Sequence, residues 1–255
     1  MKNKNILVTG ATGGIGGGIV KLLLKSGYVV YAPVRNLKVA EEKFANFANR
    51  QNLILEQCNV EDTAATLKYV EKLKMEGVNF QTVFLAAGAL FYDHDFIQLD
   101  QKMEDKIEDF KLRKAIFEKL SQAERAPFVE AAKKVNYTAN TFTKENVLLP
   151  FLDAYHDSLG ETHVELIGSQ AANFPEGHPW RFDEEGYHFS HVGVQDLGKD
   201  YGHRFGSMHV EEPALIDTPM TRIKFALNDD GTLRDWSQVP TADEYAESYL
   251  KKIGL

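Results

Sequence analysis

Short apolar runs recur along the chain at intervals that leave room for a helix between them. The runs cover residues 5–8, 28–32, 53–57, 82–86, 163–167 and 208–210. Near-continuous apolar strands that alternate with helices are typical of a parallel sheet covered on both faces. We therefore expect an α/β fold with a doubly wound parallel sheet, in which ligands bind at the carboxyl ends of the strands.

A glycine-rich turn follows the first apolar run and leads directly into a helical pattern. The turn comprises Thr9, Gly10, Ala11, Thr12, Gly13, Gly14, Ile15 and Gly16. Glycines at 10, 14 and 16 permit a tight turn and keep side chains away from a pyrophosphate, whose oxygens then meet N–H groups at the helix N-terminus. Such turns also occur in plain hairpins and helix caps, but the strand-to-helix context predicts a dinucleotide site.

One polar stretch does not fit a minimal alternation of strands and helices. Between the fourth and fifth strands, at about residues 90–134, apolar residues at 103, 107, 110 and 117 keep roughly helical spacing. This spacing predicts one or two amphipathic helices. The insertion is either a solvated surface flap or a lid or dimer contact near the active site. His94, between Asp93 and Asp95, is expected in a solvated loop.

Length and composition favour a single domain that acts on small molecules. The chain has 255 residues, a net charge of -8 and no linker or repeat, so we expect one domain over residues 1–255. The negative charge disfavours binding to nucleic acid or to an anionic membrane. With the first strand near residue 5, no signal peptide or membrane span is expected. Cys58, the single cysteine, is expected to be a small buried filler, and we expect a cytoplasmic location.

Four further motifs follow the glycine turn along the chain: Ala86-Ala87-Gly88 after the fourth strand, Asn136 in a helix, Gly168-Ser169 after the fifth strand, and residues 213–220, with Ala214 in place of a glycine. In this order the motifs resemble those of the short-chain dehydrogenases/reductases, from residue 5 to about residue 220. The resemblance implies a Rossmann fold, an NADP or NAD cofactor, and hydride transfer between nicotinamide and a small carbonyl or alcohol substrate.

The resemblance also implies which residues contact the cofactor. They are Thr9, Gly10, Thr12, Gly13, Gly14, Ile15, Gly16, Arg35, Asn59, Val60, Ala86, Ala87, Gly88, Pro213, Ala214, Ile216 and Thr218. Arg35 ends the second strand, where NAD-preferring members carry an acidic residue. Its guanidinium can hold a 2′-phosphate with no carboxylate to repel it, which favours NADP over NAD. Two points oppose this: Gly13 stands where many NADP-preferring members have a second basic residue, and Arg35 alternatively only solvates a strand end. Asn59 falls where the family has an aspartate on the adenine amino group.

The catalytic tyrosine and lysine of the family lack a direct counterpart, because no Tyr-x-x-x-Lys occurs between Ser169 and Pro213. The preferred register places Tyr187 at the tyrosine position and His191 at the lysine position. A rival register places Asp183 and Tyr187 there. In the preferred register the resemblance implies four roles: Tyr187 is the proton donor or acceptor, Ser169 orients the substrate oxygen, Asn136 supports a relay water, and His191 partly replaces the lysine.

Histidine is a weaker partner than lysine for a catalytic tyrosine. The phenol has a reference pKa of about 10, which a neighbouring cation lowers, whereas histidine, at about 6.5, is mostly neutral at pH 7. We therefore expect either a slow reductase or a site that binds cofactor without turnover. Four glycines also weaken the helix that carries this pair, so we expect it to be irregular or ordered only by ligand. They are residues 193, 198, 202 and 206.

Histidines and aromatic residues gather in the last third of the chain. Histidines 178, 188, 191, 203 and 209 lie between Ser169 and Pro213 without a compact ligand spacing, so no metal site is expected. Aromatic residues 174, 180, 182, 189, 225 and 236 flank the expected site, in part from a substrate loop at about 218–240. These rings either stack on a flat substrate or pack within extended loops.

The sequence thus favours an NADP-dependent oxidoreductase, with two alternatives. One is a cofactor-binding regulatory protein that has lost the chemistry, and the other is an atypical lyase, isomerase or dehydratase on the same fold. The chain stops soon after a helical pattern at 242–253, without the terminal glycine-rich strand through which many relatives form tetramers. We therefore expect a homodimer or a monomer.

Overall fold

A single parallel sheet forms the centre of the molecule. The computed structural model describes residues 4–99, 103–175, 185–228 and 232–255, and in these ranges six strands pair in the order β3-β2-β1-β4-β5-β6. The strands are β1 (Asn5–Thr9), β2 (Val29–Val34), β3 (Leu53–Gln57), β4 (Thr82–Leu85), β5 (His163–Ile167) and β6 (Ser207–Glu211). They lie where the apolar runs predict them, with ends that differ by one or two residues. The strand order reverses at β1 and β4, so the expected doubly wound sheet is confirmed.

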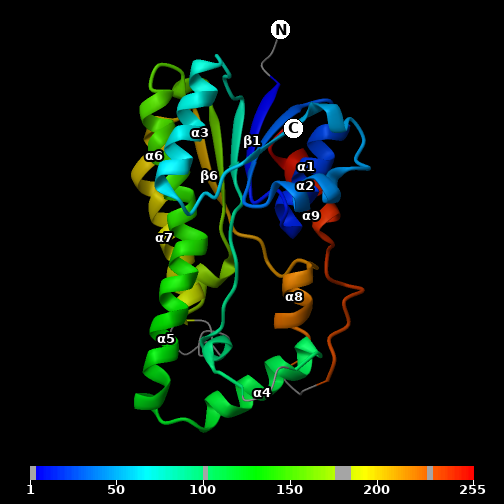
Figure 1. Cartoon of the computed structure of the whole chain (residues 1–255), viewed down its shortest axis with the longest axis vertical. Helices are drawn as coiled ribbons and strands as arrows, with labels where there is room; N and C mark the ends of the chain where they lie inside the picture. Colours follow the sequence, from blue (N-terminus) through cyan, green and yellow to red (C-terminus); the bar gives the residue numbers. More distant parts are fainter. Residues whose placement is uncertain (1–3, 100–102, 176–184, 229–231) are drawn as a thin grey trace.

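Helices cover both faces of the sheet (Figure 1). One face carries α1 (Gly14–Lys25), α2 (Leu37–Phe44) and α9 (Ala242–Lys252), and the other carries α3 (Thr63–Met75), α6 (Thr143–Ala154) and α7 (Glu185–Tyr201). Ile6 and Val8 of β1 are buried under the first group, whereas Leu7 is buried under the second. Because alternate residues point to opposite buried faces, the strands read as continuous apolar runs.

In the described part of the polar stretch between β4 and β5, two α-helices extend the molecule beyond the carboxyl edge of the sheet (Figure 1). They are α4 (Lys106–Lys119) and α5 (Gln122–Asn136). Asp105 caps the start of α4, and Ser121 with Glu124 forms a capping box at the start of α5. A π-helical turn at Tyr137–Phe142 joins α5 to α6. The helix α5, the π-helical turn and α6 (Thr143–Ala154) therefore form one continuous helical rod. Its α5 part belongs to the insertion, and its α6 part covers the sheet.

The segment around His94 is buried, so the expectation of a solvated loop was wrong. The His94 side chain has no exposed surface, and its ring stacks on Tyr92 and meets Phe110 of α4 edge-on, with centroids 5.1 Å and 4.8 Å apart. Lys224, at the end of α8 (Pro219–Lys224), forms an ion pair with Asp95, the residue that follows His94. Alternating Asp and His indicated a surface loop, but α4 and α8 cover it.

Two of the four glycines expected to weaken this helix, Gly193 and Gly198, lie in α7 and serve close packing, and the expectation of an irregular helix was wrong. The helix is continuous from Glu185 to Tyr201. A Cβ at Gly193 would lie 2.7 Å from the Thr141 Oγ1 atom, and one at Gly198 would lie 2.6 Å from Val210 Cγ2. Glycine at these positions lets α7 approach the π-helical turn and β6, so tertiary packing offsets its low helix propensity.

Two expectations from composition concern Cys58 and membrane spans. Cys58 is a free thiol buried at the end of β3, as expected of a small filler. None of the helices that the structure describes is long and apolar enough to cross a membrane.

Candidate active site

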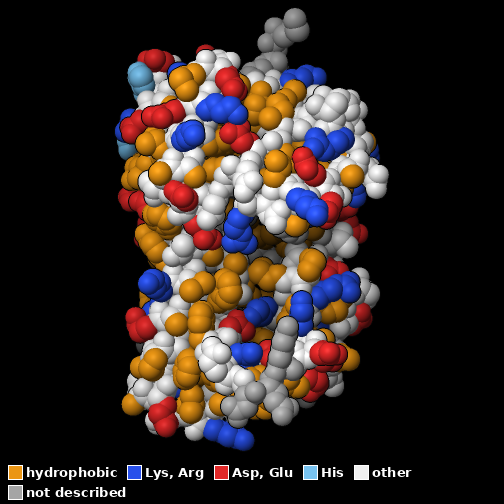
Figure 2. Space-filling model, in the orientation of Figure 1, with side chains coloured by type: hydrophobic (Ala, Val, Ile, Leu, Met, Phe, Trp, Pro, Cys, Tyr) orange, Lys and Arg blue, Asp and Glu red, His pale blue; other side chains and the backbone are white. Residues whose placement is uncertain are grey.

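A pocket of about 500 Å³ lies at the carboxyl edge of the sheet, where the strand order reverses. The space-filling view shows a waist across the molecule that is hollowed near its centre and bordered by hydrophobic side chains (Figure 2). Thirteen of the residues predicted to contact a cofactor line this pocket: Gly10, Thr12, Gly13, Gly14, Ile15, Gly16, Arg35, Asn59, Val60, Ala86, Ala87, Gly88 and Thr218. The structure therefore brings together the glycine turn and the ends of β2, β3 and β4.

The glycine turn leaves backbone donors without side chains in front of them. Gly10 has a φ of +67°, and a Cβ there would lie 2.6 Å from the Ala87 nitrogen. A Cβ at Gly16 would lie 2.3 Å from the Gly10 carbonyl oxygen, and one at Gly14 would lie 2.5 Å from Thr218 Cγ2. Gly13, the N-cap of α1, provides no side-chain hydrogen bond. The first N–H groups of α1 therefore remain available to an anion.

A lysine that sequence reasoning missed holds the glycine turn from α2. Lys43 donates hydrogen bonds from Nζ to the carbonyl oxygens of Thr12, at 2.8 Å, and Gly13, at 3.0 Å. Partial burial lowers the pKa of Lys43. The residue lies about 30 positions after the turn, on a helix with other charged side chains, so no local signal identified it.

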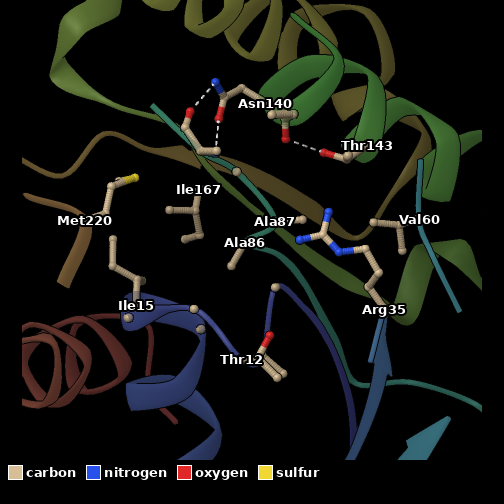
Figure 3. Close-up of a pocket in the computed structure, with 18 of the residues that line it drawn as sticks. Thr12, Ile15, Arg35, Val60, Ala86, Ala87, Asn140, Thr143, Ile167 and Met220 are labelled. Carbon is tan, nitrogen blue, oxygen red and sulfur yellow. Dashed lines mark hydrogen bonds between the residues drawn. The ribbon is translucent and has the colours of Figure 1, made fainter. Parts of the chain in front are cut away.

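Arg35 and a neighbouring carboxylate stand at one end of the pocket. Figure 3 shows Arg35 rising from the end of β2 beside Val60, on the opposite side of the pocket from Met220. The Arg35 Nη1 atom lies 3.9 Å from Glu61 Oε1, and its side chain is 77% exposed. Glu61 also lines the pocket, so the expectation that no carboxylate is present there was wrong. Asn59 Oδ1, the acceptor expected for an adenine amino group, accepts the Glu61 N–H at 3.3 Å.

Tyr187 and His191 stand at the other end, one turn apart on α7, and both line the pocket. Their rings meet edge to face, with centroids 4.4 Å apart. The His191 side chain is 3% exposed, and neither ring nitrogen has a hydrogen-bond partner among the described residues. Burial, with smaller contributions from the charges of Lys144 and His188, holds the pKa of His191 well below its usual range. His191 is therefore neutral at pH 7 and does not supply a cation.

Two asparagines, one turn apart, hold the loop after β4. Asn136 donates to the Phe91 carbonyl and accepts from the Phe91 N–H, at 2.7 and 3.0 Å, and does not line the pocket. Asn140 makes the same pair of bonds to Ala89, at 2.8 and 3.0 Å, and does line the pocket (Figure 3). Its amide also donates to Ser190 of α7. The asparagine that reaches the pocket is thus Asn140, which sequence reasoning missed.

One further turn along, Lys144 enters the interior. Its side chain is 1% exposed, and Nζ donates to the carbonyl oxygens of Ala87, at 2.7 Å, and Asn140, at 2.9 Å. Burial lowers the pKa of Lys144 to about 7. In the sequence this lysine stands next to Glu145 and Asn146, and such a polar run gives no sign of burial.

The remaining predicted cofactor and substrate residues do not line the pocket. Ser169 Oγ accepts the Ala171 N–H at 3.2 Å, and Thr9 Oγ1 accepts the Ala87 N–H at 3.2 Å and so positions the loop. The others are Pro213, Ala214 and Ile216.

The histidines and aromatic residues near the site are spread over several elements. Four of the residues considered above lie outside the described residues: His178, Trp180, Phe182 and Asp183. The rival register, which depends on Asp183, therefore also lies outside them. Phe225 packs on Tyr92, and the Phe189 side chain is exposed. No group of three metal-ligating side chains occurs in the ranges that the structure covers.

Comparisons with known proteins show both a family and a fold. Residues 2–142 match the NmrA-like family. An alcohol dehydrogenase from Thermococcus sibiricus complexed with 5-hydroxy-NADP is 16% identical, with a TM-score of 0.66 over 99% of this chain and 91% of that one. A short-chain dehydrogenase from Burkholderia cenocepacia in complex with NADP is 15% identical, with a TM-score of 0.65 over 99% and 85%. At these identities the likeness shows the fold alone, and this fold is the one that the dehydrogenase motifs predicted.

A curated relative matches over a short stretch only. The fatty acid hydroxylase uhd1 of Mycosarcoma maydis is 51% identical over 47 residues. This match spans 18% of the chain and 16% of that protein.

Proposed function

The chain belongs to the NmrA-like family, and we propose that it binds NADP(H) and transfers a hydride between nicotinamide and a small carbonyl or alcohol substrate. The observation that carries the proposal is a single pocket with the glycine turn at one end and the Tyr187–His191 pair at the other. The pocket is lined by residues at the ends of β2 and β5 and crosses the edge where the strand order reverses, which is where dinucleotides bind in such sheets.

The residues present fit this cofactor. Side chains at Gly10, Gly14 or Gly16 would collide with neighbouring atoms, and the uncapped start of α1 provides donors for the pyrophosphate. We propose that Arg35 binds the 2′-phosphate, with Glu61 beside it as an opposing charge. The unpartnered nitrogens of His191 provide a buried donor and acceptor for a polar group at the nicotinamide end.

The proposed chemistry needs one proton transfer from the protein. When bound, the nicotinamide supplies or accepts the hydride. In the reducing direction, the substrate carbonyl carbon gains the hydride and its oxygen takes the phenolic proton of Tyr187, which solvent then restores. Ser169 directly follows Gly168, which lines the pocket, and is proposed to orient the substrate oxygen, since its hydroxyl hydrogen has no acceptor in the described part of the chain. We propose that Asn140, and no longer Asn136, shapes this end of the site.

The first test measures binding and turnover separately. Titration of NADPH into the purified protein is expected to show saturable binding, and a panel of small aldehydes and ketones is expected to support NADPH oxidation that Tyr187→Phe abolishes. A protein that binds neither NADPH nor NADH contradicts the proposal.

The neutrality of His191 favours a second candidate, a cofactor-binding regulatory protein without turnover. A tyrosine without a cation one turn away is a weak acid at pH 7. Saturable NADPH binding without activity on the whole panel would select this second function. A lyase or isomerase would instead convert its substrate without net change in the cofactor.

A further inference from the structure

Lys144 is a buried ammonium group without a neighbouring anion. Both hydrogen bonds from Nζ go to backbone carbonyl oxygens, and no carboxylate pairs with it in the described part of the chain. A charge in the interior is costly unless it is paired, so such lysines are uncommon. The roles proposed above for Tyr187, Ser169 and Asn140 do not use this group.

The position of Lys144 relates it to one end of the pocket. Its two acceptors, Ala87 and Asn140, both line the pocket, and Nζ would lie 4.0 Å from a Cβ placed on Gly88. Ala87 and Gly88 follow β4, on the far side of β1 from Arg35 at the end of β2. A dinucleotide with its phosphates on the glycine turn and its adenosine at Arg35 places its nicotinamide at this end. The ammonium therefore lies behind one layer of backbone at the nicotinamide end.

We propose that Lys144 is a proton site that responds to the redox state of the cofactor, keeping its proton when NADPH is bound and releasing it to solvent when NADP+ is bound. The inference rests on the proposed NADP(H) binding. The oxidised nicotinamide ring carries a positive charge and the reduced ring does not. Two like charges in a poorly solvated interior repel each other, so the oxidised ring favours neutral Lys144. Only an N–H bond breaks in this step, and the proton goes to water.

Two other titratable groups that line the pocket, His191 and Cys58, stay neutral near pH 7. Burial lowers the pKa of Lys144 to about 7. His191 on α7 interacts with it electrostatically and His188 interacts with His191, but His191 is neutral because its pKa is well below its usual range. Cys58, at the end of β3, stays a neutral thiol because burial raises its pKa. The preference for NADPH over NADP+ is therefore expected to fall as the pH rises through neutrality.

The test compares the dissociation constants of NADP+ and NADPH by calorimetry between about pH 6 and pH 8.5. In the wild-type protein, the ratio of the NADP+ constant to the NADPH constant is expected to fall on the order of five- to tenfold over this range. The two cofactors carry the same phosphates, so phosphate titration cancels in the ratio. In buffers of different ionisation enthalpy, NADP+ binding is expected to release about half a proton at pH 7 and NADPH binding none.

Two variants decide whether the effect belongs to Lys144. Lys144→Met is expected to make the ratio independent of pH. Lys43→Met is the matched control, because Lys43 also donates to two backbone carbonyl oxygens but lies at the glycine turn. It is expected to weaken both cofactors alike and to keep the wild-type slope. If Lys144→Met does not fold, Lys144→Gln keeps a hydrogen-bond donor without a charge. It is likewise expected to make the ratio of the two dissociation constants independent of pH.

The outcomes separate this inference from the function on which it rests. Failure of both cofactors to bind overturns both. Binding of both with a constant ratio in the wild-type protein overturns the Lys144 inference alone and leaves the proposed function standing. A wild-type slope that persists in Lys144→Met, or that disappears in Lys43→Met, also overturns it.

Discussion

The two ends of the pocket are built in different ways. At the end where we propose that the cofactor phosphates bind, the phosphate end, the eight consecutive residues from Thr9 to Gly16 contribute mostly backbone groups and missing side chains. At the nicotinamide end, Asn140 and Lys144 come from one helical rod and Tyr187 and His191 from another helix, more than 40 positions later. A site made of backbone groups can thus be specified by one short sequence motif, whereas a site made of side chains depends on how helices distant in the sequence pack together.

The electrostatics of the two ends differ in the same way. Arg35 is largely exposed, so water and salt screen its charge. Lys144 and His191 are buried, and burial shifts both pKa values downward. We therefore expect the phosphate end to set cofactor affinity and type, and the nicotinamide end to set chemistry and pH dependence.

The largest expected effect separates chemistry from binding at the nicotinamide end. Tyr187→Phe removes the proposed proton donor and is expected to lower turnover by about 10²- to 10⁴-fold, while NADPH affinity stays unchanged. Steady-state rates and a binding titration on the same preparation check this. Full activity in Tyr187→Phe would show that the preferred register is wrong.

At the phosphate end, a side chain on the glycine turn is expected to abolish most binding. Gly14→Val brings atoms against Thr218 and is expected to weaken NADPH and NADH alike, by about 1 to 3 kcal/mol or more. Gly160→Ala is the control, because a Cβ at Gly160 has open space around it. In Gly14→Ala, the second change Thr218→Ser, which removes the colliding methyl group, is expected to restore part of the affinity. Wild-type affinity in Gly14→Val would contradict the assignment of this end.

The buried charge at the nicotinamide end is expected to appear in the pH dependence of stability. The pKa of Lys144 is about 7 in the folded protein and higher in the unfolded chain, so between these values the unfolded chain binds more protons. The free energy of unfolding therefore gains a contribution that rises with pH, by up to about 1 kcal/mol per pH unit from pH 7 to 9. Urea unfolding at several pH values is expected to show a flatter profile in Lys144→Met than in the wild-type protein. Equal slopes would mean that Lys144 keeps an ordinary pKa.

The smallest expected effect concerns the exposed charges beside the ribose. Arg35→Ala is expected to weaken NADPH by about tenfold and NADH far less, because only NADPH has the 2′-phosphate. Glu61→Gln removes the carboxylate near Arg35 and is expected to shift the preference a few-fold further toward NADPH. Titrations with both cofactors measure these ratios, and equal wild-type affinities for NADPH and NADH would contradict the role of Arg35.

The sequence by itself determined the strands, the glycine turn and the one-turn spacing of Tyr187 and His191. These features depend on local patterns: apolar runs for strands buried on both faces, glycine where backbone atoms approach closely, and helical periodicity. A single sequence is enough to read them because the residues concerned are neighbours in the chain.

Only the tertiary structure decided which polar side chains are buried and what they face. It placed Asn140 rather than Asn136 in the pocket wall, buried Lys144 behind it, and brought Lys43 to the glycine turn and Glu61 beside Arg35. Lys144 and Lys43 both stand among polar neighbours that are typical of helix surfaces. Their burial, and with it their pKa, depends on which distant element covers them, and no local pattern encodes that contact.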